Sequence, residues 1–276
     1  MGILIAILVL IALVLILIAP SPRRRRADSW RSTAFAHRGL HGNGAAENTP
    51  EAFERACRAG FGIELDVQFS RDSTIVVFHD DDLKRMTGDA RRVDEVDLAE
   101  LQSLALAGGD GHIPRFEDVL KQVNGRVPLL VELKTGRRNA ELCRQTSEML
   151  KRYRGKYLVE SFNPLMMRWF KKNAPEMLRG QLVGKWTDYL STLGRPGAFL
   201  LSSLALNALS RPDFVAYDVS AEHFPAPHIQ RALFHTPLAA WTVRDEETFA
   251  ACLARGEMPI FENFVPESKS SLGSRE

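Results

Sequence analysis

The sequence predicts a (β/α)8 barrel of the TIM type, and two observations carry this prediction. Short apolar runs alternate with helical patterns from residue 33 onward, as expected when each strand is followed by a helix that covers it. The apolar runs number eight, which closes a parallel barrel: 33–39, 62–68, 128–134, 156–162, 178–184, 213–219, 237–243 and 258–263. A doubly wound open sheet is the alternative, but no GxGxxG follows the first strand, which weakens a dinucleotide site.

The helical patterns between these runs carry recognisable end signals. In the first, Asn48 or Thr49 can cap the helix, Pro50 suits its first turn and Gly60 suits its exit. Three further helical patterns follow at 139–153, 163–173 and 245–256. The sequence thus alternates between the two element types that a barrel of this class needs.

The second strand departs from this alternation, because another apolar run, TIVVFHD at 74–80, follows it with no helix between. We expect a hairpin that turns over 71–74 and places Asp66 opposite His79. Residues 80–125 then form an insertion before the third barrel strand. A segment of this length at a barrel mouth suits a substrate cover.

The first 20 residues contain no charged side chain, and four arginines follow at 23–26. A helix of about 20 residues spans about 30 Å, the thickness of the hydrocarbon core of a bilayer. Basic residues after the apolar stretch place the following domain in the cytoplasm by the positive-inside rule, and they would also contact anionic headgroups. An uncleaved export signal with inverted topology is the alternative.

We therefore expect a single-pass protein of the cell membrane whose main domain is cytoplasmic. Its segments would be a transmembrane anchor at 1–20, a basic juxtamembrane linker at 21–31, a barrel domain at 32–266 and a disordered polar tail at 267–276.

The composition excludes several classes of protein. The three cysteines, at 57, 143 and 252, are far apart and lack CxxC spacing, so a disulfide framework or a zinc site is not expected and a reducing compartment fits. The net charge is +2 and much of the basic excess lies at 23–26, so no nucleic-acid partner is indicated. No obligate protein partner is inferred.

Two carboxylates interrupt the second apolar run. Glu64 and Asp66 are two residues apart in a strand, so they point to the same face. Two close carboxylates repel, and one would be neutralised unless a cation lies between them. Glu132 is a third acid in an apolar run, and we expect it across the mouth from Glu64. Oxygen ligands of this kind suit one divalent cation, Mg²⁺ or Ca²⁺.

Further polar groups fall near the C-terminal ends of predicted strands, where barrels build their active sites. His37 and Arg38 end the first strand, His79 ends the hairpin, and Lys134 follows Glu132 on the same face. Each group alone has a structural explanation, such as an edge carboxylate or a hydrogen-bonded histidine. Their coincidence at the same strand ends instead indicates a metal, two imidazoles and two cations around a phosphate group.

The segment AHRG, then ENTPEAFERACRAGFGIELDVQFSRDSTIVVFHDDDLKRMTG, closely resembles the glycerophosphodiester phosphodiesterases. HIPRFEDVL, VELK, VESFNP and AAWTV match later motifs in the right order, so the resemblance covers roughly residues 33–263. It implies a TIM barrel with a small insertion after the HD motif. By this resemblance, Glu64, Asp66 and Glu132 would bind the metal, and His37 and His79 would be the general acid and base. Arg38 and Lys134 would hold the phosphate. Glu47 and Asn48 would line the site, and Trp241 would contact the glycerol.

The resemblance implies metal-dependent hydrolysis of glycerophosphodiesters to glycerol 3-phosphate and an alcohol, with lysophospholipids as larger substrates. A phospholipase D-type enzyme that forms a cyclic phosphate and a non-catalytic anchored binding module are the alternatives. The sequence departs from the family pattern in the last strand, where FENFVPE replaces a T-D-x-P-like motif. Glu262 and Asn263 are the residues available for equivalent contacts there.

Overall fold

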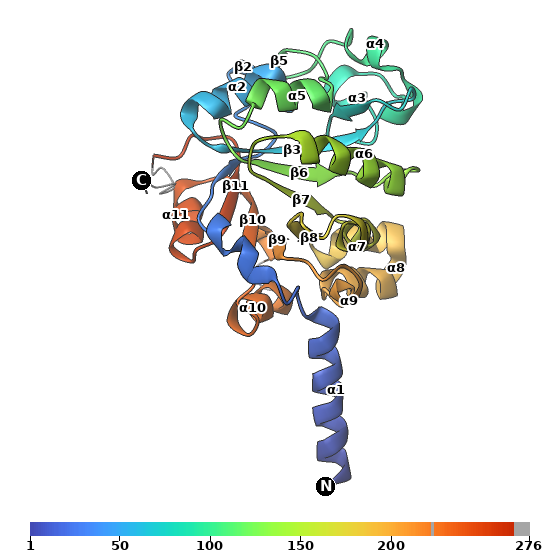
Figure 1. The fold of residues 1–276 in the computed structure, drawn as a ribbon, viewed down its shortest axis with the longest axis vertical. Helices are drawn as coiled ribbons and strands as arrows, with labels where there is room; N and C mark the ends of the chain where they lie inside the picture. The colour runs from blue at the N-terminus through green and yellow to red at the C-terminus, as the bar shows by residue number, and fades with distance from the viewer. Residues whose placement is uncertain (222–223, 268–276) are drawn as a thin grey trace.

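A closed parallel barrel forms the centre of the molecule (Figure 1), as seen in a computed structural model that describes residues 1–221 and 224–267. Strand β1 closes the barrel because it pairs with both β3 and β11. Each of the eight predicted runs contains one barrel strand, which confirms the predicted fold. These strands are β1 (Phe35–Ala36), β3 (Gly62–Phe69), β6 (Leu129–Leu133), β7 (Tyr157–Ser161), β8 (Arg179–Val183), β9 (Phe214–Asp218), β10 (Leu238–Val243) and β11 (Met258–Phe261).

Helices surround the barrel on its outer side (Figure 1). The first of them, α2 (Pro50–Ala59), begins at Thr49, whose hydroxyl accepts a hydrogen bond from the backbone N–H of Ala52, and it ends at Gly60 with φ 77°. Thr49 is therefore the cap, rather than Asn48. The others are α5 (Phe116–Val123), α6 (Asn139–Arg152), α7 (Pro164–Asn173), α8 (Trp186–Ser202), the short α9 (Asn207–Ser210), α10 (Pro225–Ala232) and α11 (Glu246–Ala254).

The barrel interior is layered along the strands. Leu130 and Leu158 belong to a buried apolar cluster that also holds Trp30 and Phe35. Glu132 and Glu160 lie two residues further along the same strands and therefore point to the same face. The carboxylates thus form a polar layer above an apolar floor, at the C-terminal end of the barrel. Each fully buried Leu or Phe in that floor contributes roughly 1.5–3 kcal/mol to folding.

The predicted hairpin exists, but its register differs from the prediction by one residue. Strand β4 (Ile75–Val77) pairs antiparallel with β3, with Phe69 opposite Ile75. Phe78 donates its N–H to the carbonyl of Asp66, so Phe78 and not His79 lies opposite Asp66. The turn is shorter than predicted because Ser73 adopts φ 66°, which lets three residues close the loop.

The segment after the hairpin has a small apolar core of its own, which includes Val76, Leu83 and Ile113. It contains the short elements α3 (Lys84–Thr87), η2 (Val93–Glu95), α4 (Leu98–Leu101) and β5 (Gly109–Asp110), the last paired with β2 (Gly44–Ala45). Helix α5 also falls within the predicted insertion, but it packs against α2 on the outside of the barrel. The segment touches the barrel mouth through Arg85 of α3.

At the N-terminus, α1 (Gly2–Ile18) is a single apolar helix that projects from the barrel (Figure 1). Within the described residues, no helix is both long enough and apolar enough to cross a membrane. The expected spanning helix at 1–20 is therefore not supported, since the 17 residues of α1 reach only about 25 Å.

The expected basic linker is a packed segment. It forms the 3-10 helix η1 (Arg24–Trp30), whose Ala27 and Trp30 are buried against the barrel. Arg24 donates to the carbonyl of Phe234, and Arg26 donates to that of Glu176. At the other end of the chain, the expected disordered tail lies outside the described residues beyond Glu267.

Candidate active site

Three buried carboxylates form the centre of the site. Glu64 and Asp66 project from β3, and Glu132 lies beside Asp66 on the adjacent strand β6. One carboxylate oxygen from each residue lies within 4.8 Å of the others. The three acids are therefore neighbours on two adjacent strands, whereas we expected Glu132 across the mouth from Glu64.

The electrostatic surroundings of Glu64 and Asp66 shift their pKa values in opposite directions. Burial raises the pKa of Glu64 well above its usual value, and the nearby Asp66 and Glu132 raise it further. Burial would also raise the pKa of Asp66, but the charges of Lys134, His79 and Arg38 lower it instead. Lys134 lies 2.8 Å from Glu132 Oε1 and 3.4 Å from Asp66 Oδ1. Among the described residues, none donates a hydrogen bond to Asp66 Oδ1.

This donor set fits a divalent cation. Buried, close, like-charged carboxylates are costly unless a cation joins them, and hard oxygen donors match Mg²⁺ or Ca²⁺. The buried Oδ1 of Asp66, which lacks a hydrogen bond from the described residues, is the kind of atom that a metal would use. Glu64, Asp66 and Glu132 are thus able to hold one divalent ion.

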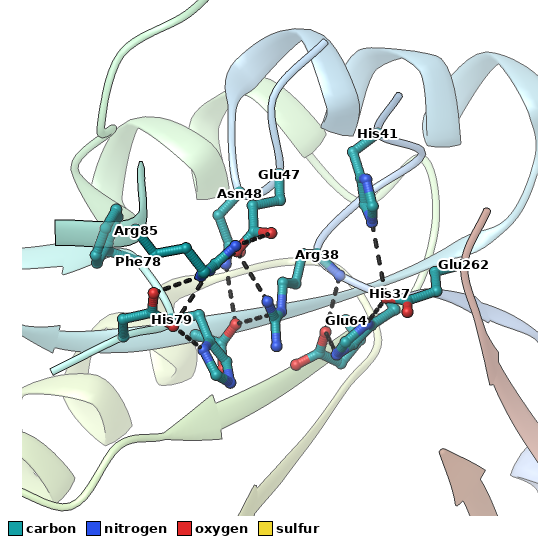
Figure 2. Close-up of polar contacts among 12 residues, drawn as sticks. His37, Arg38, His41, Glu47, Asn48, Glu64, Phe78, His79, Arg85 and Glu262 are labelled. Carbon is teal, nitrogen blue, oxygen red and sulfur yellow. Dashed lines mark hydrogen bonds and ion pairs between the residues drawn. The ribbon is translucent and has the colours of Figure 1, made fainter. Parts of the chain in front are cut away.

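The end of β1 brings His37 and Arg38 to the carboxylates. Gly39 allows the chain to turn back here, because its φ is 79° and a Cβ would lie 2.9 Å from the Cβ of Ala52. The backbone N–H of Arg38 donates to Glu64 Oε2 at 2.9 Å, and its guanidinium donates to Glu47 at 2.8 Å. This loop therefore orients a metal-ligand candidate and supplies a cation beside it (Figure 2).

His37 is held through one ring nitrogen. Its Nδ1 lies 2.6 Å from Glu262 Oε2, while its Nε2 lies 3.9 Å from Glu64 Oε2. Burial lowers the pKa of His37, and the hydrogen bond to Glu262 opposes that change. Burial would raise the pKa of Glu262, but His37 lowers it to about 2, so Glu262 is an ionised acceptor at neutral pH. The Nε2 atom is left to face the site.

His79 shows the same arrangement. Its Nδ1 lies 2.6 Å from Asp80 Oδ1, and Arg85 pairs with the same carboxylate. Burial would raise the pKa of Asp80, but the bonds to His79 and Arg85 lower it. Arg85 also pairs with Glu47, which links helix α3 to the loop after β1 (Figure 2). Two histidines thus present Nε2 while a carboxylate holds each Nδ1.

Both histidines line one open cavity of about 590 Å³, a size suited to a small ligand. On its far side, Trp241 packs edge-on against Phe162, with ring centroids 5.6 Å apart. Seven of the ten predicted site residues line this cavity: His37, Arg38, Glu47, Glu64, His79, Glu132 and Trp241.

The other three predicted residues lie directly behind the cavity wall. Asn48 donates its amide N–H to Asp66 Oδ2 at 2.9 Å, and Lys134 pairs with Asp66 and Glu132. Burial would lower the pKa of Lys134, but Glu132 and Asp66 raise it, so this side chain stays cationic. In this structure its ammonium group is directed at the carboxylates.

Several residues that line the cavity were not predicted from the sequence. Glu160 is buried and its pKa is raised by burial and by Glu132, yet it was read only as part of VESFNP. Its place two residues after Leu158 in an apolar strand is the signal that could have identified it. His41, Arg85 and Arg244 also line the cavity. His41 and Arg244 lie in loops and Arg85 lies in the short helix α3 of the insertion, where strand periodicity predicts nothing about direction.

Comparisons with known proteins identify a family. The model of the glycerophosphoryl diester phosphodiesterase family matches residues 37–267. A glycerophosphodiester phosphodiesterase of Bacillus altitudinis is 29% identical over 242 residues, which cover 83% of this chain and 94% of that one. A human lysophospholipase D is 34% identical over 141 residues, 46% of this chain and 43% of its own.

Solved structures share the fold. A phosphodiesterase from Oleispira antarctica, in complex with sn-glycerol-3-phosphate, superposes with a TM-score of 0.68 at 24% identity and covers 86% of this chain and 94% of that one. A glycerophosphodiester phosphodiesterase from Parabacteroides distasonis gives 0.65 at 23% identity, with 83% and 92% covered. Since the family model spans most of the sequence, this chain belongs to the glycerophosphoryl diester phosphodiesterase family.

Proposed function

We propose that this chain hydrolyses glycerophosphodiesters to glycerol 3-phosphate and an alcohol. One observation carries the proposal: three metal-competent carboxylates and two carboxylate-held histidines converge on a single cavity. Membership of the family and the relatives' names support the same activity. The human lysophospholipase D relative supports lysophospholipids as a second substrate class.

The residues divide the reaction between them. The chemistry that a divalent cation supplies at Glu64, Asp66 and Glu132 is neutralisation of charge on the phosphoryl oxygens. Arg38 adds a fixed positive charge beside them.

The two histidines transfer the protons of the reaction. The Nε2 of one histidine accepts the proton of the nucleophile, and the Nε2 of the other gives a proton to the leaving alcohol. Glu262 and Asp80 keep each ring in the orientation this requires. Trp241 would contact the glycerol.

Phosphorus NMR of the products tests the proposal and its two alternatives. The 276-residue chain with Mg²⁺ or Ca²⁺ is expected to convert glycerophosphocholine to glycerol 3-phosphate. Accumulation of a cyclic phosphate as the sole product would contradict simple hydrolysis and support the phospholipase D-type alternative. The absence of either product across headgroups and metals would favour a non-catalytic binding module.

We also propose that α1 attaches the chain to the cell membrane with the barrel on the cytoplasmic side. The large apolar side chains from Ile3 to Val14 are exposed, which is costly in water and favourable in lipid. The arginines at 23–26, which lie beyond the helix, favour the cytoplasmic side.

Replacing Leu8 and Ile11 together with lysine is expected to release the chain from the membrane fraction, because it removes apolar surface from α1 and places two charges where lipid would lie. Hydrolysis of glycerophosphocholine should stay unchanged, since α1 projects away from the barrel. Leu233→Lys, at an equally exposed position just after α10, is the control. Labelling of Arg137→Cys by an impermeant maleimide added to intact cells would contradict the cytoplasmic placement.

A further inference from the structure

An apolar groove lies beside the catalytic cavity, between α7, α8 and α9. Its volume is about 560 Å³, and leucines dominate its lining: Leu165, Leu193, Leu200, Leu201, Leu206 and Leu209. Leu165 is 58% exposed, Leu193 47% and Leu200 43%. A contiguous apolar surface of this kind is uncommon on a soluble domain unless it binds something.

The groove begins at the mouth of the barrel. Phe162 lines both the groove and the catalytic cavity, and its ring packs against Trp241. Thr135 and Asn163, which also line the groove, belong to the loops that follow β6 and β7. Tyr189 completes this rim, because its hydroxyl accepts a hydrogen bond from the backbone N–H of Gly184 after β8. Phe162 therefore lies at the boundary between the two sites.

The groove ends beside the apolar N-terminal helix. Leu206 and Leu209 flank Asn207, whose amide donates to the carbonyl of Ile18 at the end of α1. Arg211 donates to the carbonyls of Ile16 and Ala19. Figure 1 shows α8 and α9 on the side of the barrel from which α1 projects. The apolar path thus leads from α1 to the catalytic mouth.

We propose that this groove binds the single acyl chain of a lysophospholipid while its phosphodiester lies at the carboxylates. The proposal rests on the proposed function and names the subsite that function would use. The glycerol would lie at Trp241, with the chain passing Phe162 into the groove. Water forms a bond to phosphorus, the bond from phosphorus to the headgroup oxygen breaks, and the alcohol leaves with a proton. The products are a lysophosphatidate and the headgroup alcohol.

Choline release from two substrates tests the subsite. Leu193→Glu and Leu200→Glu place a charge in the groove, so kcat/KM for palmitoyl lysophosphatidylcholine is expected to fall about tenfold or more. The value for glycerophosphocholine, which has no acyl chain, should stay within about twofold. Phe199→Glu is the matched control, because Phe199 is 57% exposed on the same helix but does not line the groove.

Equal losses on both substrates, or an equal effect of Phe199→Glu, would overturn the proposal. A change of oligomeric state without a change of substrate preference would assign the groove to a second copy instead. Unmodified chain gives an independent check: kcat/KM for monomeric lysophosphatidylcholines should rise by up to about fourfold per added methylene, and a flat profile would overturn the subsite. Activity on glycerophosphocholine alone refutes only the subsite, whereas inactivity on both substrates refutes the proposed function as well.

Discussion

His79→Ala is expected to lower kcat for glycerol 3-phosphate release by about 10²–10⁴-fold, the usual contribution of a positioned acid or base. His79 lines the catalytic cavity, and Asp80 holds its Nδ1 so that Nε2 faces the site. His37→Ala should cause a loss of similar size, since Glu262 holds that ring in the same way. Steady-state kinetics on glycerophosphocholine, with the metal in excess, measure both effects.

The control is His112→Ala, an exposed histidine that does not line the cavity. A glycerophosphodiester with a nitrophenol leaving group then separates the two roles, because nitrophenolate departs without a proton. The variant that lacks the general acid should recover much of its rate on this substrate, and the variant that lacks the base should not. Unchanged activity on glycerophosphocholine in both variants would contradict the acid–base mechanism. Recovery of both variants on the nitrophenol substrate would contradict the assignment of one histidine as acid and the other as base.

Chelation of divalent cations is expected to abolish activity and to lower the melting temperature. A ligand at 100 times its Kd stabilises the folded state by about 2.7 kcal/mol, which corresponds to roughly 5–10 °C in a domain of this size. The physical reason is that the cation offsets the repulsion among Glu64, Asp66 and Glu132. Thermal unfolding with EDTA and with added Mg²⁺ or Ca²⁺ measures the effect and ranks the two ions.

The metal effect should depend on pH. The pKa of Glu64 is raised in the folded chain, so without metal the folded state keeps a proton that the unfolded state loses above about pH 4.5. Stability of the metal-free chain should therefore fall as pH rises from about 4.5 toward the raised pKa, and added metal should stabilise the chain more at pH 8 than at pH 5.

Glu64→Gln separates the metal effect from a general loss of folding. The amide oxygen can still accept the backbone N–H of Arg38, and the buried charge is gone. We expect the metal-free variant to melt higher than the unmodified chain at neutral pH, without a response to metal and without activity. Glu148→Gln, on the exposed face of α6, is the control. A full metal response in Glu64→Gln would contradict the proposed ligand set.

The strand pattern was readable in the sequence because each buried strand is a short apolar run between helical segments with clear ends. The acids at 64, 66 and 132 were identifiable for the same reason, since a carboxylate within such a run must be compensated. The placement of these groups at one end of the barrel followed from parallel strands alone. These features depend on local composition and strand periodicity, which the sequence contains in full.

Details of the site that depend on loops were not predictable in the same way. The hairpin register was wrong by one residue because Ser73 adopts a left-handed conformation that shortens the turn. His79 still reaches the cavity, since it lies two residues beyond the end of β4 at Val77, outside the strict alternation of the strand. His41 and Arg244 reach the site from loops, and Arg85 reaches it from the short helix α3 of the insertion.

For the N-terminal helix too, the composition could be read from the sequence, whereas the long-range contacts could not. The apolar composition of residues 1–20 was evident, and Pro20 favours an end to α1 just before it, but the side chains of Asn207 and Gln230 that bind the last carbonyl of the helix were not predictable. Those contacts join residues nearly 200 positions apart, so no local pattern could contain them. The sequence by itself determined the barrel, the apolar helix and the chemical types at the strand ends. Only the tertiary structure decided the turn register, the carboxylate that holds each histidine and the groove beside the mouth, because each depends on contacts between distant segments.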